Sequence, residues 1–151
     1  MMGIGTTSTI APTSPAHAKE KGPPPMSVKE AVDAVAYELR DPMGSVGRLQ
    51  NALDDLDYAA LLEQTKTMDQ SLRKRVVGQA KYYWSDQNRA TQLSNAVTFD
   101  LIGINRNARS GQESRDGVRQ YLDELRRDLS TILRYTEEAA ASAAETTVDS
   151  S

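Results

Sequence analysis

The densest cluster of cation-binding groups in this 151-residue chain consists of three acidic residues, Asp54, Asp55 and Asp57. Three carboxylates are able to bind Ca²⁺, but the ligand spacing and the glycine of the EF-hand loop are missing. The cluster falls at an expected corner between two helices, where Asp57 is suited to accept a hydrogen bond from the first turn of the second helix. We therefore expect helix capping rather than a metal site, and the sequence predicts no cofactor.

Histidine and cysteine, the residues that most often carry nucleophilic and metal chemistry, are almost absent. The chain has no cysteine and one histidine, His17, which lies in a proline-rich leader. The rest of the chain therefore lacks the imidazole or thiolate that Ser-His and Cys-His nucleophiles, haem, the usual zinc sites and the Glu-x-x-His pairs of di-iron bundles require. It also lacks a glycine-rich phosphate loop and a Gly-x-Ser-x-Gly motif. We predict that the protein is not an enzyme.

Charge and hydropathy argue against two classes of partner. The formal net charge of −3 is carried by the residues after Ala18, whereas a nucleic-acid-binding domain usually has a clustered basic face and a high isoelectric point. No apolar run approaches the roughly 18 residues of a membrane span. We expect no nucleic-acid partner and no transmembrane helix.

The two ends of the chain differ in composition from the rest and are expected to lie outside the folded domain. Residues 1–18 contain no Lys, Arg, Asp or Glu and end in Ala16-His17-Ala18, which fits a signal-peptidase cleavage site. Because no basic segment precedes this site, residues 1–18 are expected to be either the second half of a longer targeting leader that is removed, or an ordinary disordered segment. Residues 19–26 predict an extended proline-rich arm. Residues 145–151 lack apolar periodicity and predict a disordered tail.

Apolar residues recur at helical spacing through residues 27–144, and in the first and last predicted helices the intervals alternate between four and three, the pattern of packed helices. Ser27-Val28-Lys29-Glu30 is a capping box that starts the first helix. Pro42 interrupts this helix because proline cannot donate a backbone amide and its ring crowds the preceding turn. Three further helices and short loops predict an all-α, antiparallel, up-and-down four-helix bundle, with the first helix kinked or broken near Pro42. A long helical hairpin that dimerises into four strands is the alternative.

The predicted helices after the first one begin at Asp57, at Asp86 and near Ser114. Phe99 and Ile102 lie beside the apolar stripe of the third helix. The predicted inward positions of the last two helices are Leu93, Val97, Leu101, Ile104 and Ala108, then Val118, Leu122, Leu125, Leu129, Ile132, Thr136, Ala139 and Ala143.

Two groups of side chains are candidates for docking on another protein. A basic strip from Lys66 to Lys81 ends in three aromatic residues, and Tyr, Trp and Arg are favoured at interface hot spots. Four arginines gather around the end of the third helix, where planar guanidinium groups suit carboxylates or anionic headgroups. The alternatives are a solvated helix face with Tyr83 in the core and Trp84 capping the bundle end, and arginines that complement the helix dipole. The candidate docking residues are Arg73, Lys74, Arg75, Lys81, Tyr82, Trp84, Arg106, Arg109, Arg115 and Arg119.

The stretch from Ala96 to Glu113, AVTFDLIGINRNARSGQE, resembles the additional extrinsic subunits of photosystem II in diatoms and related red-lineage algae. The segments DQSLRK from Asp69 and YLDEL from Tyr121 extend this resemblance over most of residues 27–137, and its most specific part is Thr98–Gln112. The family is similar in fold to the PsbQ four-helix proteins. The resemblance implies a non-catalytic protein of the plastid thylakoid lumen, peripheral on the membrane. Its implied partners are the photosystem II core and the other extrinsic subunits, and its implied role is to stabilise the oxygen-evolving site and the retention of its ions.

A second hypothesis uses the inside of the bundle rather than its outside. The same leader and helices fit a helical-bundle binding module of a periplasm or lumen, with a small-molecule or metal ligand held between the helices. This hypothesis requires a polar cavity or an open metal position between the helices. The presence or absence of such a site in the structure distinguishes it from surface docking.

Overall fold

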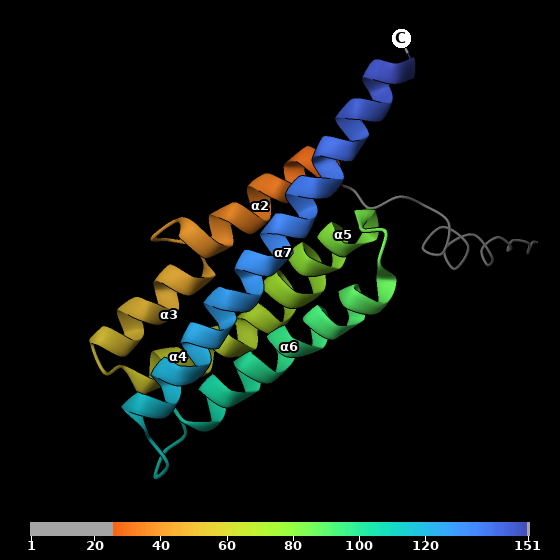
Figure 1. Cartoon of the computed structure of the whole chain (residues 1–151). Helices are drawn as coiled ribbons and strands as arrows, with labels where there is room; N and C mark the ends of the chain where they lie inside the picture. The colour runs from red at the N-terminus through yellow and green to blue at the C-terminus, as the bar shows by residue number, and fades with distance from the viewer. Residues whose placement is uncertain (1–25, 151) are drawn as a thin grey trace, which may run out of the picture.

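The computed structural model describes residues 26–150, and it describes side chains as far as residue 145. The predicted leader at residues 1–18, and the predicted arm except for Met26, lie outside the described residues. Within residues 26–150 the chain forms helices joined by short turns, with no β-strand. The helices pack side by side as a bundle (Figure 1). None of the described helices combines the length and the apolar content that a membrane span requires.

Helix α2 (Val28–Arg40) begins with the capping box expected from the sequence. The Ser27 hydroxyl accepts from the Glu30 amide at 3.1 Å, and the Ser27 amide donates to the Glu30 carboxylate at 2.9 Å. The helix ends at Arg40, and α3 (Ser45–Asp54) follows after a turn that contains Pro42. In this turn the Met43 amide donates to the Asp41 carboxylate at 2.8 Å, a side-chain bond that replaces a helical one.

The second predicted helix is divided into four segments of different helical type. It begins with α4 (Tyr58–Met68), whose N-terminus is capped by Asp57 accepting from the Ala60 amide at 3.0 Å, as the acidic cluster predicted. The chain continues as the π-helix η2 (Asp69–Val77), the short helix α5 (Gly78–Ala80) and the 3₁₀ turn η3 (Lys81–Tyr83). A π-helix makes i→i+5 bonds and is usually a single turn. The sequence did not predict it.

The buried residues of η2 follow its wider turn. Leu72 is fully buried, and the next buried residues are Val76 and Val77, four and five positions further on. In an α-helix of 3.6 residues per turn, consecutive residues are about 100° apart around the axis, so the two valines would not both lie on the same face as Leu72. The apolar seam therefore continues through the segment although the helical type changes.

The last two helices form the centre of the core. Helix α6 (Gln87–Arg106) is capped by Asp86, which accepts from the Arg89 amide at 3.0 Å, and α7 (Arg115–Ser150) packs against α6, α2 and α3 (Figure 1). The predicted inward positions from Leu93 to Ala108 and from Val118 to Thr136 are buried.

The C-terminal end of α7 differs from the expectation. The sequence predicts a disordered tail from residue 145, but the structure continues α7 as a helix to Ser150. The run from Ala139 to Ala144 is rich in alanine, the best helix former, and an existing helix extends at little cost through such a run. Ala139 is half-buried and Ala143 is exposed, because this end of α7 extends beyond its neighbours (Figure 1).

Candidate functional site

The three consecutive basic residues of the predicted strip lie on η2, but they differ in their surroundings. Arg73 donates from Nε to Asp69 Oδ1 at 2.7 Å, and its side chain is only 25% exposed. This hydrogen bond lowers the pKa of Asp69 and raises that of Arg73. Lys74 and Arg75 are exposed and make no ion pair with any described residue. Two of the three cations are thus available to a partner, whereas Arg73 is engaged within the helix.

The three aromatic residues that follow the strip lie in three different environments. Tyr82 is 53% exposed on η3. Tyr83 is half-buried and donates its hydroxyl to the Met26 carbonyl. Trp84 is 6% exposed, and its indole Nε1 donates to Thr136 Oγ1 at 3.2 Å. The structure therefore places Trp84 in the core at the bundle end, which was the alternative interpretation, and leaves Tyr82 as the exposed aromatic residue beside the half-buried Lys81.

The four arginines of the predicted corner do gather at one end of the molecule. Arg106 ends α6, Arg109 lies in the following loop, and Arg115 and Arg119 lie in the first turns of α7. All four are exposed. The pair between Arg119 and Asp116, at 3.4 Å, is a surface ion pair of small energetic value. Figure 1 shows this loop at the opposite end of the bundle from α5, so the corner lies far from the C-terminal end of the basic strip, whereas Lys66 at the start of the strip lines a groove together with Arg109.

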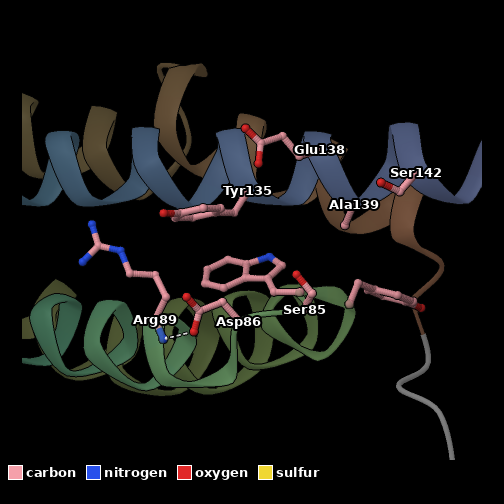
Figure 2. A pocket seen from close by; sticks show the side chains of 9 residues that line it. Ser85, Asp86, Arg89, Tyr135, Glu138, Ala139 and Ser142 are labelled. Atoms are coloured by element: carbon pink, nitrogen blue, oxygen red, sulfur yellow. Dashed lines mark hydrogen bonds between the residues drawn. The ribbon is translucent and has the colours of Figure 1, made fainter.

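A cavity of about 260 Å³ lies at the other end of the bundle, between the start of α6 and the C-terminal half of α7 (Figure 2). Aromatic walls flanked by carboxylates suit an alkylammonium or guanidinium group, whereas the guanidinium of Arg89 suits a carboxylate. The cavity is thus chemically mixed and selects neither sign of charge. Its lining residues are Tyr83, Trp84, Ser85, Asp86, Arg89, Tyr135, Glu138, Ala139 and Ser142.

One buried acid was missed by the sequence analysis. Asp100 on α6 is 3% exposed, and its Oδ2 atom has no hydrogen-bond donor among the described residues. Burial, followed by a hydrogen bond to Asp128 and the charges of Asp128 and Glu124, raises the pKa of Asp100 to about 9 against the opposing effect of Arg127. The signal was present in the sequence, because position 100 falls between inward positions 97 and 104 of the stripe. Asp100 does not line the end cavity.

The acidic cluster at the α3–α4 corner has structural partners. Asp54 accepts from Gln50 Nε2 at 2.8 Å, and Asp57 caps α4. Within the part of the chain that the structure describes, no group of three or more His, Asp or Glu side chains is arranged to hold a metal ion.

Comparisons with known proteins assign the chain to no family. No protein-family model, no curated protein and no solved structure matches it.

Proposed function

We propose that the protein is a non-catalytic extrinsic subunit that docks on the lumenal face of photosystem II, in the plastid thylakoid lumen, and stabilises the oxygen-evolving site and its retention of ions. The partner is taken from the resemblance carried by residues 96–113. The observation that carries the docking mode is the pair of exposed cations Lys74 and Arg75 on η2, which have no ionic partner among the described residues.

The bundle that presents this pair is proposed to be an antiparallel, up-and-down four-helix bundle whose first helix is broken at Pro42. Two features support this arrangement. The turn between α2 and α3 contains Pro42, which cannot continue a helical hydrogen-bond ladder. The loop between α6 and α7 is short, and short loops between packed helices favour antiparallel neighbours.

Surface cations of this kind attract an acidic partner over a distance and fix its orientation more than they add affinity. Their attraction is screened within about 8–10 Å at physiological ionic strength. The engaged Arg73 contributes little, since its charge is offset by Asp69. We therefore expect binding that salt reverses and that depends on Lys74 and Arg75.

The test is rebinding to salt-washed photosystem II membranes. The double variant K74E/R75E should lose rebinding at low salt, whereas wild type rebinds and is released as salt rises. The matched control K29E/R40E makes the same change of net charge at exposed positions on α2 and should rebind like wild type. Rebinding of K74E/R75E with the affinity of wild type would overturn the proposal.

A second candidate function is favoured by the end cavity. A bundle-type binding module of a periplasm or lumen would hold a small molecule there, and about 260 Å³ is slightly below the usual range of about 300–1,000 Å³ for ligand pockets. Isothermal titration with choline and with free arginine tests it. Heat with either compound that disappears in the variant Y135A would support this function, and no heat with either would contradict it.

A further inference from the structure

The outward face of α6 carries two large apolar side chains in its C-terminal half. Phe99, the only phenylalanine of the chain, is 67% exposed, and Ile102 is 41% exposed. Residues three apart lie on the same side of a helix, so the two side chains form one ridge. Scattered apolar residues are common on protein surfaces, but an aromatic and an aliphatic residue side by side next to arginines have the composition of an interface hot spot.

A shallow groove of about 230 Å³ runs beside this ridge, between α6 and the α4–η2 segment. Ile102 belongs to both the ridge and the groove, and Leu101 lies next to it along the groove wall. The opposite wall is formed by Thr65, Lys66 and Asp69. The ridge and the groove together offer a place for one apolar side chain of a partner.

Arg109 is held at this groove by a chain of hydrogen bonds. Its Nε donates to Asn105 Oδ1 at 3.1 Å, Asn105 Nδ2 donates to Thr65 Oγ1 at 2.9 Å, and Thr65 Oγ1 donates to the Leu62 carbonyl at 3.0 Å. The terminal guanidinium nitrogens of Arg109 have no partner among residues 26–145. A guanidinium fixed through Nε is positioned in advance to bind a carboxylate with little loss of entropy.

The rim of the groove is positively charged. Lys66 and Arg109, which line the groove, are exposed and form no ion pair with a described carboxylate, and the same holds for Arg106, four positions after Ile102 on α6. Asp69, the one acid that lines the groove, is already paired with Arg73 at 2.7 Å. The surface thus combines an apolar centre with cations that remain uncompensated.

We propose that Phe99, Ile102 and the adjacent groove form a docking surface for a protein segment that carries one apolar anchor side chain flanked by carboxylates. Charge complementarity selects the acidic flanks, and the concave groove beside Ile102 takes a protruding side chain rather than a flat lipid surface. This surface uses other residues than the Lys74–Arg75 pair, so it stands whether or not the proposed function does.

A random peptide display library tests the proposal without any photosystem. The library is selected on the wild-type protein and depleted on the variant F99S, and the most enriched peptide is then titrated into ¹⁵N-labelled protein. We expect peptides with an apolar residue between Asp or Glu, and shift changes confined to residues 98–109 and 65–69. F99S and R109Q should each weaken the binding about tenfold, which corresponds to about 1.4 kcal/mol. N95S, an exposed position on the same side of α6, should bind like wild type.

Four results would overturn the proposal. The first is that no binding peptide survives the depletion on F99S, and the second is a basic or uncharged consensus. The third is binding to vesicles of anionic lipid that F99S abolishes while no peptide binds, which would make the surface a membrane contact. The fourth is a concentration-dependent dimer that F99S abolishes, which would make it a contact between two copies of this chain. Because F99S changes an exposed residue, circular dichroism should show that it folds like wild type.

Discussion

The buried carboxyl of Asp100 on α6 lies beside the carboxyl of Asp128 on α7, and the two groups share a hydrogen bond only when one of them carries a proton. Asp100 is the group that keeps the proton, because burial disfavours its charged form most strongly. Two helices of the core are therefore joined by a contact whose strength depends on pH.

The first prediction concerns this contact. Folding raises the pKa of Asp100 from 3.8 to about 9, so the folded state holds this proton more tightly than the unfolded state. The stabilisation is complete below about pH 4 and is lost as the pH rises toward 9. The variant D100N keeps a neutral donor facing Asp128, so it should be more stable than wild type at pH 9, by about 1–3 kcal/mol.

Urea unfolding at pH 5, 7 and 9 measures this effect. The control D123N removes an exposed carboxylate of α7 that pairs with Arg126 at 3.1 Å, and it should run parallel to wild type. Parallel curves for D100N and wild type would show that Asp100 is ionised in the folded state.

The second prediction concerns the close approach of α6 and α7. A Cβ atom added at Gly103 would lie 2.4 Å from ring carbons of Tyr121, and these carbons are close to the backbone of α7. The variant G103A should therefore unfold about 1–3 kcal/mol more easily because of overpacking. The same substitution at Gly78 meets only the Arg73 carbonyl at 3.8 Å, so G78A should gain about 0.5–1 kcal/mol from helix propensity.

Thermal melts of both glycine variants decide the matter, because the two changes have the same chemistry and opposite expected signs. Equal shifts of the melting temperature would mean that the α6–α7 contact is looser than the structure describes.

The third prediction concerns Trp84. The variant W84F leaves Thr136 without the indole donor and reduces the packed volume at the bundle end, so it should lose about 1–3 kcal/mol of unfolding free energy. Y82F changes an exposed side chain and should be neutral. Circular dichroism in urea measures both variants, and a neutral W84F would contradict the buried placement of this ring.

The fourth prediction separates the three basic residues of η2. Because Arg73 is hydrogen-bonded to Asp69 and its side chain is only 25% exposed, it is less available than Lys74 and Arg75 for direct contact with a partner, so R73Q should weaken rebinding to washed membranes the least of the three single variants. K74Q and R75Q should each weaken it more than R73Q does. Equal losses for all three would mean that Arg73 leaves Asp69 on binding.

The seams of α6 and α7 could be predicted from the sequence because apolar spacing directly reports which face of a helix is buried. Asp57 and Ser27 could be predicted as caps for a similar reason, since capping is a local interaction. The burial of Trp84 and Asp100 could not be settled in this way. Both depend on partners more than 20 residues away along the chain, Thr136 and Asp128, whose positions only the packed bundle defines.

The side chains of the two proposed docking surfaces could be singled out from the sequence only in part. The clustering of basic residues in the sequence identified Lys74, Arg75 and the arginine corner as candidates, but it did not show that Arg73 forms an ion pair with Asp69. Phe99 and Ile102 could be placed beside the stripe from the sequence, and their exposure follows from how α6 packs against its neighbours. The groove next to them is formed by residues of α6 and of the α4–η2 segment together, so no pattern within one stretch of sequence predicts it.

The π-helix η2 has a consequence for how this chain tolerates insertions and deletions. A π-helix contains more residues per turn than an α-helix. The length of a π segment therefore affects the direction in which the side chains of the following helix point. Loss of one residue within Asp69–Val77 would allow an α-helical ladder, and it would change the angle at which α5 and η3 follow the segment. The direction in which the exposed Tyr82 side chain points from the bundle thus depends on the number of residues in η2.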